Sequence, residues 1–388
     1  MTTGGRRRAS EPSTLRVLIL NPGSSTLKAA VIEPPARDAL ASATVDWGAD
    51  ATRGSDRTSA VAAVLKVIEA DGVARGSITA VGYRVVHGGM RFVGPTLIDE
   101  GAIEAIETLT ELAPLHNRIA AATIRAARTA LPGIPHMAVF DTAFHATLPP
   151  AAYRYPVPER WFHDWGVRRF GFHGLSVAWS LTRAAELLGR PASELRLVVA
   201  HLGSGCSVTA VDGGRSVDTS MGMTPLEGLM MGTRAGSIDP GVLLALLREG
   251  RVTVAELEDD LDHRSGLLGV SRRSADVREL LVAEAAGDQA VALALELFVR
   301  RAAAGIAAAA TCMPAIDGVV FTGGIGENSG QMRARISARL AVLRIPTISD
   351  ADFHEDEVLT DAARTPAVLR IQAREDVVIA EAVRSVLP

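Results

Sequence analysis

Short apolar runs bounded by glycine and polar turns alternate along this chain with segments whose apolar residues recur at helical spacing. In the first helical segment, Val61, Val64 and Ile68 fall on one face. We expect strands at residues 15–20, 27–32, 81–86, 137–140, 197–200 and 207–211, a strand with a glycine turn over 318–326, and helices at 61–68, 103–109, 116–130, 302–310, from near Glu327, and at 377–386. This alternation predicts an α/β fold.

A unit of strand, Gly/Ser turn and strand occurs twice, about half the chain apart. It occupies residues 15–32 and again residues 197–211, which suggests two related domains facing one another. The proline-rich and aromatic stretch 149–158 is typical of a connector between domains. The last helix, 377–386, is long enough to pack back on the first domain.

Composition and charge narrow the class of protein. The 388 residues carry a formal net charge of −4, which argues against a nucleic-acid binder that relies on a basic surface. Two cysteines, Cys206 and Cys312, cannot form a disulfide framework and indicate a reducing cytoplasm. No stretch is typical of a membrane span, and residues 1–14 are expected to form a disordered tail. Only Lys28 and Lys66 are lysines, so a lysine in a glycine-rich turn stands out.

Three glycine-rich turns, residues 21–28, 201–207 and 321–328, are suited to bind phosphate. Their backbone N–H groups and hydroxyls donate hydrogen bonds, and Lys28 adds positive charge to the first turn. That turn is not a Walker A loop, because a strand follows it where a helix would be required. A plain hairpin turn stays the alternative for each one alone, whereas three in one chain favour an enzyme that binds nucleotide phosphates.

Four charged or imidazole side chains lie at predicted strand ends and in turns: Arg84, Asp141, His173 and Arg234. Asp141 ends a buried strand, a common position for a residue that binds Mg²⁺ or orients a substrate. An arginine beside a glycine-rich turn can donate two parallel hydrogen bonds to a phosphoryl group. Structural salt bridges and buried core histidines remain the alternative for each residue.

One long block, residues 218–234, carries the most specific signal. Read in order with residues 113–117, 140–145 and 321–328, it resembles the acetate kinase family, within the acetate and sugar kinase, Hsp70 and actin superfamily. The resemblance spans about residues 15–380, nearly the whole chain.

The resemblance implies both a fold and a reaction. The fold would be two ribonuclease-H-like (actin-like ATPase) domains facing a central cleft, with residues 15–150 plus 376–388 in the N-terminal domain and 151–375 in the nucleotide-binding C-terminal domain. The reaction would be ATP + acetate ⇌ ADP + acetyl phosphate, with Mg²⁺, or Mn²⁺ in its place, in a cytoplasmic homodimer that binds neither nucleic acid nor membrane.

The resemblance also implies roles for single residues. Arg84 and Arg234 would hold the acetyl and phosphoryl groups. His173 would hydrogen-bond the transferred phosphoryl group, and Asp141 would be the essential acid. The metal ligands, the substrate pocket and the nucleotide contacts would be, in that order: Asn21 and Glu375; Arg84, Val86, Leu115, Phe172 and Pro225; Ser24, Thr26, Lys28, His201, Gly203, Ser204, Gly205, Asp276, Val277, Arg278, Gly323, Gly324, Ile325, Gly326 and Asn328.

Some positions depart from the family pattern, namely Tyr83, Met90, Arg118, Leu175, Val177, Ser204, Met223 and Ser237. Ser204 matters most, because it replaces an asparagine that would face a nucleotide phosphate, and its shorter side chain predicts weaker nucleotide binding. The expected catalytic residues are all present, so we expect an active enzyme. The alternatives are a kinase for propionate or another short-chain acid, and a catalytically silent nucleotide-binding protein.

Overall fold

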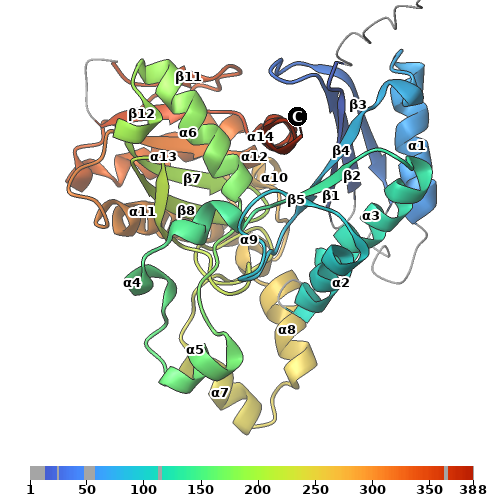
Figure 1. Cartoon of the computed structure of the whole chain (residues 1–388). Helices are drawn as coiled ribbons and strands as arrows, with labels where there is room; N and C mark the ends of the chain where they lie inside the picture. The colour runs from blue at the N-terminus through green and yellow to red at the C-terminus, as the bar shows by residue number, and fades with distance from the viewer. Residues whose placement is uncertain (1–13, 24–25, 48–56, 112–115, 362–365, 388) are drawn as a thin grey trace, which may run out of the picture.

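The computed structural model describes residues 14–23, 26–47, 57–111, 116–361 and 366–387. Two six-stranded mixed sheets, each with its own helices, make up this part of the chain (Figure 1). The predicted α/β class is therefore confirmed. Within the same residues, no helix has both the length and the hydropathy of a membrane span.

The first sheet has the strand order β3-β2-β1-β4-β6-β5. Its strands are β1 (Val17–Pro22), β2 (Thr26–Ile32), β3 (Ala39–Asp46), β4 (Ala80–Val85), β5 (Thr96–Leu97) and β6 (His136–Phe140). The first three strands pair antiparallel, whereas β4 is parallel to both β1 and β6. The carboxyl ends of β1, β4 and β6 therefore meet at one edge of the sheet.

The second sheet repeats this arrangement strand for strand, in the order β9-β8-β7-β10-β12-β11. Its strands are β7 (Arg196–Leu202), β8 (Cys206–Asp212), β9 (Arg215–Thr219), β10 (Gly318–Thr322), β11 (Glu357–Val358) and β12 (Ala367–Arg370). Again the first three pair antiparallel, and β10 is parallel to β7 and β12. The prediction of two similar actin-like domains is thus confirmed. Their exact boundaries, near residues 150 and 375, stay a prediction.

Helices cover the outer face of each sheet, and α6 and α14 lie between the two sheets. The helices are α1 (Arg57–Ala70), α2 (Glu100–Thr108), α3 (Asn117–Ala130), α4 (Pro150–Tyr153), α5 (Glu159–Trp165), α6 (Gly174–Leu188), α7 (Pro240–Arg248), α8 (Val254–His263), α9 (Gly266–Ser271), α10 (Val277–Ala285), α11 (Gln289–Ala310), α12 (Gly323–Asn328), α13 (Gly330–Ala338) and α14 (Glu375–Val386). Figure 1 shows α14 between the two halves of the molecule, where it packs on α6 and on the first sheet. The last helix thus returns to the first domain, as expected.

The side chains of β1 alternate between two hydrophobic clusters on opposite faces of the first sheet. Leu18 and Leu20 belong to the cluster under α1 and α3, whereas Val17 and Ile19 belong to the cluster that contains α6 and α14. Successive side chains of a strand point to opposite faces, so a strand buried on both faces reads as one continuous apolar run. The pattern that predicted the strand therefore also reflects its central place in the sheet.

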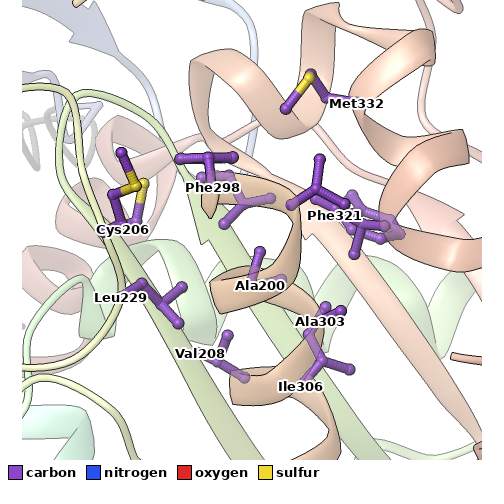
Figure 2. Packing of buried hydrophobic residues seen from close by; sticks show 14 of the residues in the cluster. Ala200, Cys206, Val208, Leu229, Phe298, Ala303, Ile306, Phe321 and Met332 are labelled. Atoms are coloured by element: carbon purple, nitrogen blue, oxygen red, sulfur yellow. The ribbon is translucent and has the colours of Figure 1, made fainter. Parts of the chain in front are cut away.

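The core of the second domain forms between its sheet and the long helix α11. Phe298, Ala303 and Ile306 of this helix lie against side chains of β7, β8 and β10 (Figure 2). The predicted buried helix at 302–310 is confirmed, since Ala302 and Ile306 are at most 1% exposed. Small alanine side chains let the helix approach the sheet closely.

The helix after β10 begins earlier than the sequence suggested. We expected a glycine turn up to residue 326 and a helix from near Glu327, but α12 already starts at Gly323. Gly323 has a φ of +77°, a backbone conformation that favours glycine. The Glu327 side chain accepts a hydrogen bond from the Gly323 N–H, which closes this short helix across the glycine-rich segment.

A prediction follows for Gly82 in β4, where the absence of a side chain lets α14 approach the sheet. A Cβ at this position would lie 2.5 Å from Ile379 Cγ2 and 3.2 Å from Val383 Cγ2. Gly82→Ala should therefore lower the free energy of unfolding by about 1–3 kcal/mol through overpacking, measured by urea unfolding. Gly76→Ala, where a Cβ would meet no atom within 4 Å, is the control. Equal stabilities of the two variants would contradict this packing.

Candidate active site

A cavity of about 810 Å³ opens between the two sheets. Both domains contribute to it, through the ends of strands and the turns that follow them. Its lining includes Asn21, Thr26, Lys28, Arg84, His173, His201, Gly203, Ser204, Gly205, Gly323, Gly324, Glu327, Gln372, Ala373, Glu375 and Asp376. Segments far apart in the sequence thus meet around one space, large enough for a nucleotide-sized ligand.

At one wall of the cavity, Arg84 forms an ion pair with Asp141. Arg84 Nε lies 3.1 Å from Asp141 Oδ1, and Nη2 lies 2.5 Å from Oδ2, so the contact is bidentate. Arg84 also lies 3.4 Å from Glu375 Oε2, and Asn21 Nδ2 donates to that same oxygen at 2.9 Å. Asn21 and Arg84 lie near the carboxyl ends of the parallel strands β1 and β4, and Asp141 directly follows β6, so all three lie at the same edge of the first sheet. Glu375 is the first residue of α14.

The charges of this cluster depend on one another. Burial lowers the pKa of Arg84, but the charges of Asp141 and Glu375 outweigh it and hold the guanidinium protonated. Burial raises the pKa of Asp141 above its usual range; Arg84 opposes this shift and Glu375 adds to it. Two carboxylates therefore share one arginine, which leaves a net negative charge suited to a cation.

Oxygen atoms of Asn21 and Glu375 are the groups here that could hold a metal ion. The described residues contain no group of three or more His, Cys, Asp or Glu side chains placed to bind a metal. One carboxylate and one amide oxygen fit Mg²⁺, which usually keeps several waters and is held by one or two carboxylates together with substrate phosphates. The donor set therefore fits a metal that enters with a nucleotide.

Across the cavity, His173 and His201 stack with their ring centroids 4.0 Å apart. Each ring is held by a serine: His173 Nδ1 lies 2.9 Å from Ser207 Oγ, and His201 Nδ1 lies 2.8 Å from Ser176 Oγ. Burial, the neighbouring imidazole and Arg84 and Arg234 all lower the pKa of His173 well below its usual value. His173 is thus neutral at pH 7 and can donate or accept a hydrogen bond without changing the local charge.

Arg234 lies next to His173, over the turn that follows β7. A Cβ at Gly205 would lie 3.4 Å from His173 Nε2 and 3.5 Å from Arg234 Nη1, so both side chains face the same backbone position. Arg234 Nη1 donates to the carbonyl of Pro225 at 3.3 Å. Among the residues that the structure describes, its one ion pair is the distant contact with Asp262 at 3.8 Å, so the guanidinium is available to an anion.

The structure describes most of the residues expected to form the substrate pocket. Val86 and Phe172 are buried in one cluster, and the Pro225 carbonyl holds Arg234. Leu115 lies outside the described residues, as does Ser24 of the first turn. Burial lowers the pKa of His116, beside Leu115, to about 4, and the charges of Arg234 and Arg84 add to this shift.

The predicted nucleotide residues divide into two groups. Thr26, Lys28 and the turn residues His201, Gly203, Ser204, Gly205, Gly323 and Gly324 line the cavity. The lining does not include Asp276, Val277, Arg278, Ile325, Gly326 and Asn328. Val277 is buried in the domain core, and the exposed Arg278 pairs with Asp276. The assignment of this second group to nucleotide binding stays a prediction.

His87 joins the two domains. Its Nδ1 accepts the Gly89 N–H at 2.9 Å, so Nε2 carries the proton and donates to the Met223 carbonyl at 3.2 Å. Asn117 fixes the His87 backbone through two further hydrogen bonds. Both ring nitrogens are satisfied, which makes His87 a structural link to the block that carries Arg234.

Sequence reasoning missed several residues of the cavity wall, including Ser42, Thr44, Glu327, Gln372 and Asp376. Most come from segments without a distinctive motif, and only pairing between distant strands brings them here. Glu327 is different, because a charged residue directly after an apolar strand and a glycine run is itself a signal.

A prediction concerns acid stability. His87 and His145 are at most 1% exposed, and burial lowers the pKa of each to about 4. The unfolded chain binds more protons than the folded chain between that value and the ordinary histidine pKa, so this stability is complete above about pH 6.5 and is lost as the pH falls toward 4. Each histidine should contribute a slope of about 1.4 kcal/mol per pH unit. Urea unfolding at pH 7.5, 6.0 and 5.0 measures it, and His145→Gln should make the profile shallower; parallel profiles would contradict the assignment.

Comparisons with known proteins agree with this geometry. The sequence profile of the Acetokinase family matches residues 16–381. The chain is 44% identical to an acetate kinase of Deinococcus radiodurans, over 94% of this chain and 96% of that protein, and 50% identical to one of a Synechococcus strain, over 80% and 77%.

Two solved structures are also similar to the whole chain. The acetate kinase of Porphyromonas gingivalis has a TM-score of 0.86 at 32% identity, and a propionate kinase of Francisella tularensis has 0.84 at 33% identity. Each comparison covers 96% of this chain and 100% of the other.

Proposed function

The chain belongs to the acetokinase family and is a phosphotransferase, and from this premise we propose that it catalyses ATP + acetate ⇌ ADP + acetyl phosphate. The observation that carries the proposal is the cavity lined by Arg84, Glu375 and His173, with Asp141 paired to Arg84 and with Arg234 facing the same backbone position as His173. Anionic groups of both substrates would meet arginines from the two domains there.

The chemistry needs positioning more than proton transfer. Acetate is already a carboxylate at pH 7, since its pKa is near that of Glu, about 4.3, so no general base has to activate it. We propose that Arg84 orients the attacking carboxylate. We also propose that Arg234 and neutral His173 donate hydrogen bonds to the phosphoryl group while it is transferred. Preorganised donors of this kind stabilise the charge that spreads over the transferred group.

Asp141 is proposed as the essential acid, acting by position. Its two carboxylate oxygens accept hydrogen bonds from Nε and Nη2 of Arg84 and so orient the guanidinium. Mg²⁺, or Mn²⁺ in its place, would be held by Asn21 and Glu375 and would neutralise charge on the nucleotide phosphates. Lys28, Thr26 and the turns at 201–205 and 323–326 would contact ATP or ADP.

A kinase for propionate is the second candidate, favoured by the similar TM-scores of the acetate and propionate kinase structures. An apolar pocket discriminates by only about 1–3 kcal/mol per methylene group. We therefore expect acetate to be preferred and propionate to react more slowly.

Incubation of the purified chain with Mg-ATP, hydroxylamine and acetate, propionate or butyrate tests the proposal. Acyl hydroxamate should form fastest from acetate, and none should form without ATP. A faster rate with propionate would favour the second candidate, whereas no hydroxamate from any acid would leave a silent nucleotide-binding protein.

We also propose a cytoplasmic homodimer that binds neither nucleic acid nor membrane. Free Cys206 and Cys312 support a reducing compartment, and exposed apolar side chains on α7 and α8, such as Leu244 and Val254, support self-association. Light scattering after size-exclusion chromatography measures the mass, and a monomer would contradict the dimer.

A further inference from the structure

Glu327 is a carboxylate in the cavity wall to which the proposed reaction gives no role. It lies near the end of α12, is 9% exposed and lines the cavity together with Gly323, Ala373 and Glu375. Burial raises its pKa, although two backbone amides oppose the shift. A buried carboxylate costs stability unless its oxygens are satisfied, so its partners indicate what it does.

One oxygen of this side chain joins two segments that are far apart in the sequence. Glu327 Oε1 accepts the N–H of Gly323 at 2.9 Å and the N–H of Ala373, also at 2.9 Å. Gly323 opens the glycine-rich turn proposed to meet the nucleotide, and Ala373 precedes the proposed metal ligand Glu375 by two residues. The carboxylate thus sets the distance between the two segments.

The backbone of Glu327 is itself held firmly. Its carbonyl accepts from Arg333 Nη1 at 2.8 Å and from Arg370 Nε at 3.2 Å, and both arginines are at most 3% exposed. On the other side, a Cβ at Gly323 would lie 2.8 Å from the Leu202 carbonyl, so this turn presses against the end of β7. The Glu327 side chain therefore extends from a backbone segment that these contacts hold in place.

We propose that Glu327 is a positioning residue, which holds the Gly323 turn and the backbone before Glu375 in one relation so that nucleotide and divalent cation bind together. The proposal rests on the proposed function for the roles of these two segments. Only the acceptor oxygen is required, so Glu327→Gln should preserve the arrangement and Glu327→Ala should release both amides.

The test measures ADP binding by calorimetry with and without Mg²⁺, beside urea unfolding. The gain in ADP affinity on adding Mg²⁺ should fall about tenfold in Glu327→Ala, within the effect usual for residues that orient metal ligands, and should return in Glu327→Gln. KM for ATP should rise in Glu327→Ala while KM for acetate changes little. The control is Asp317→Ala at the opposite end of β10, where Asp317 accepts the Arg196 N–H at 2.8 Å; it should lower stability only.

Three results would overturn the proposal: an unchanged gain in Glu327→Ala, an equal loss in Asp317→Ala, or no recovery in Glu327→Gln. If Glu327→Ala does not fold, Glu327→Asp replaces it, because the shorter side chain cannot reach both amides and should show the same loss. If the wild-type chain binds Mg-ADP but phosphorylates no acid, the proposed function fails, while the calorimetry still decides the role of Glu327.

Discussion

Replacement of Arg234 by alanine should lower kcat about 10³-fold, the low end for an arginine that stabilises a transferred phosphoryl group. Arg234 is the less compensated of the two arginines, with its ion-pair partner Asp262 at 3.8 Å. It faces the same backbone position as neutral His173, so the pair can donate to one anion. The structural cost should be small, about 1 kcal/mol for the hydrogen bond to the Pro225 carbonyl.

The measurement pairs steady-state kinetics with urea unfolding. Arg251→Ala is the matched control, because that arginine is 69% exposed and its ion pair with Glu249 lies on the surface; both kinetics and stability should stay near wild type. Wild-type kcat in Arg234→Ala would remove Arg234 from the mechanism. Loss of folding in this variant would instead assign it a structural role.

Replacement of Arg84 by alanine should affect both activity and stability. We expect kcat to fall about 10³-fold and the free energy of unfolding to fall by about 3–5 kcal/mol, the usual cost of breaking a buried ion pair. Asp141, 1% exposed, would be left beside Glu375 with no cation. Protonation of Asp141 would relieve this repulsion, so the destabilisation should be larger at pH 7.5 than at pH 5.

A double variant separates the two effects. Arg84→Met with Asp141→Leu removes both charges and should regain much of the lost stability, because apolar residues of similar volume can replace a buried pair. Activity should stay as low as in Arg84→Ala. Recovery of activity together with stability would show that Arg84 matters only for folding.

The two domains could be predicted from sequence because a local pattern repeats. Apolar strands on both sides of a Gly/Ser turn occur at 15–32 and 197–211, and both became β-hairpins at the same place in matching sheets. Two-residue β5 and β11 carry no such signal, because pairing with a longer strand defines them. The early start of α12 was missed for a similar reason: a contact with the Glu327 side chain overrides the low helix propensity of glycine.

Some residues of the candidate site could likewise be predicted from the sequence, and others could not. Arg84, Asp141, His173 and Arg234 stood out because charged residues follow apolar strands or lie in glycine-rich turns. Tyr83, one residue before Arg84, departs from the family pattern, yet it hydrogen-bonds buried His136 on the opposite face of the sheet. Strand alternation thus keeps this substitution away from the cavity.

Local patterns in the sequence were sufficient to predict β1, β2, β4, β6, β7, β8 and β10, some of the helices, the family and the charged residues at strand ends, because each depends on periodicity or on a contiguous motif. Three contacts became known only from the folded structure: Asp141 and Glu375 share Arg84, His87 joins the domains, and Glu327 connects Gly323 to Ala373. These contacts join residues up to about 290 positions apart. The contact of His87 with Met223 depends in addition on how the two sheets pack through α6 and α14, which no local pattern in the sequence records.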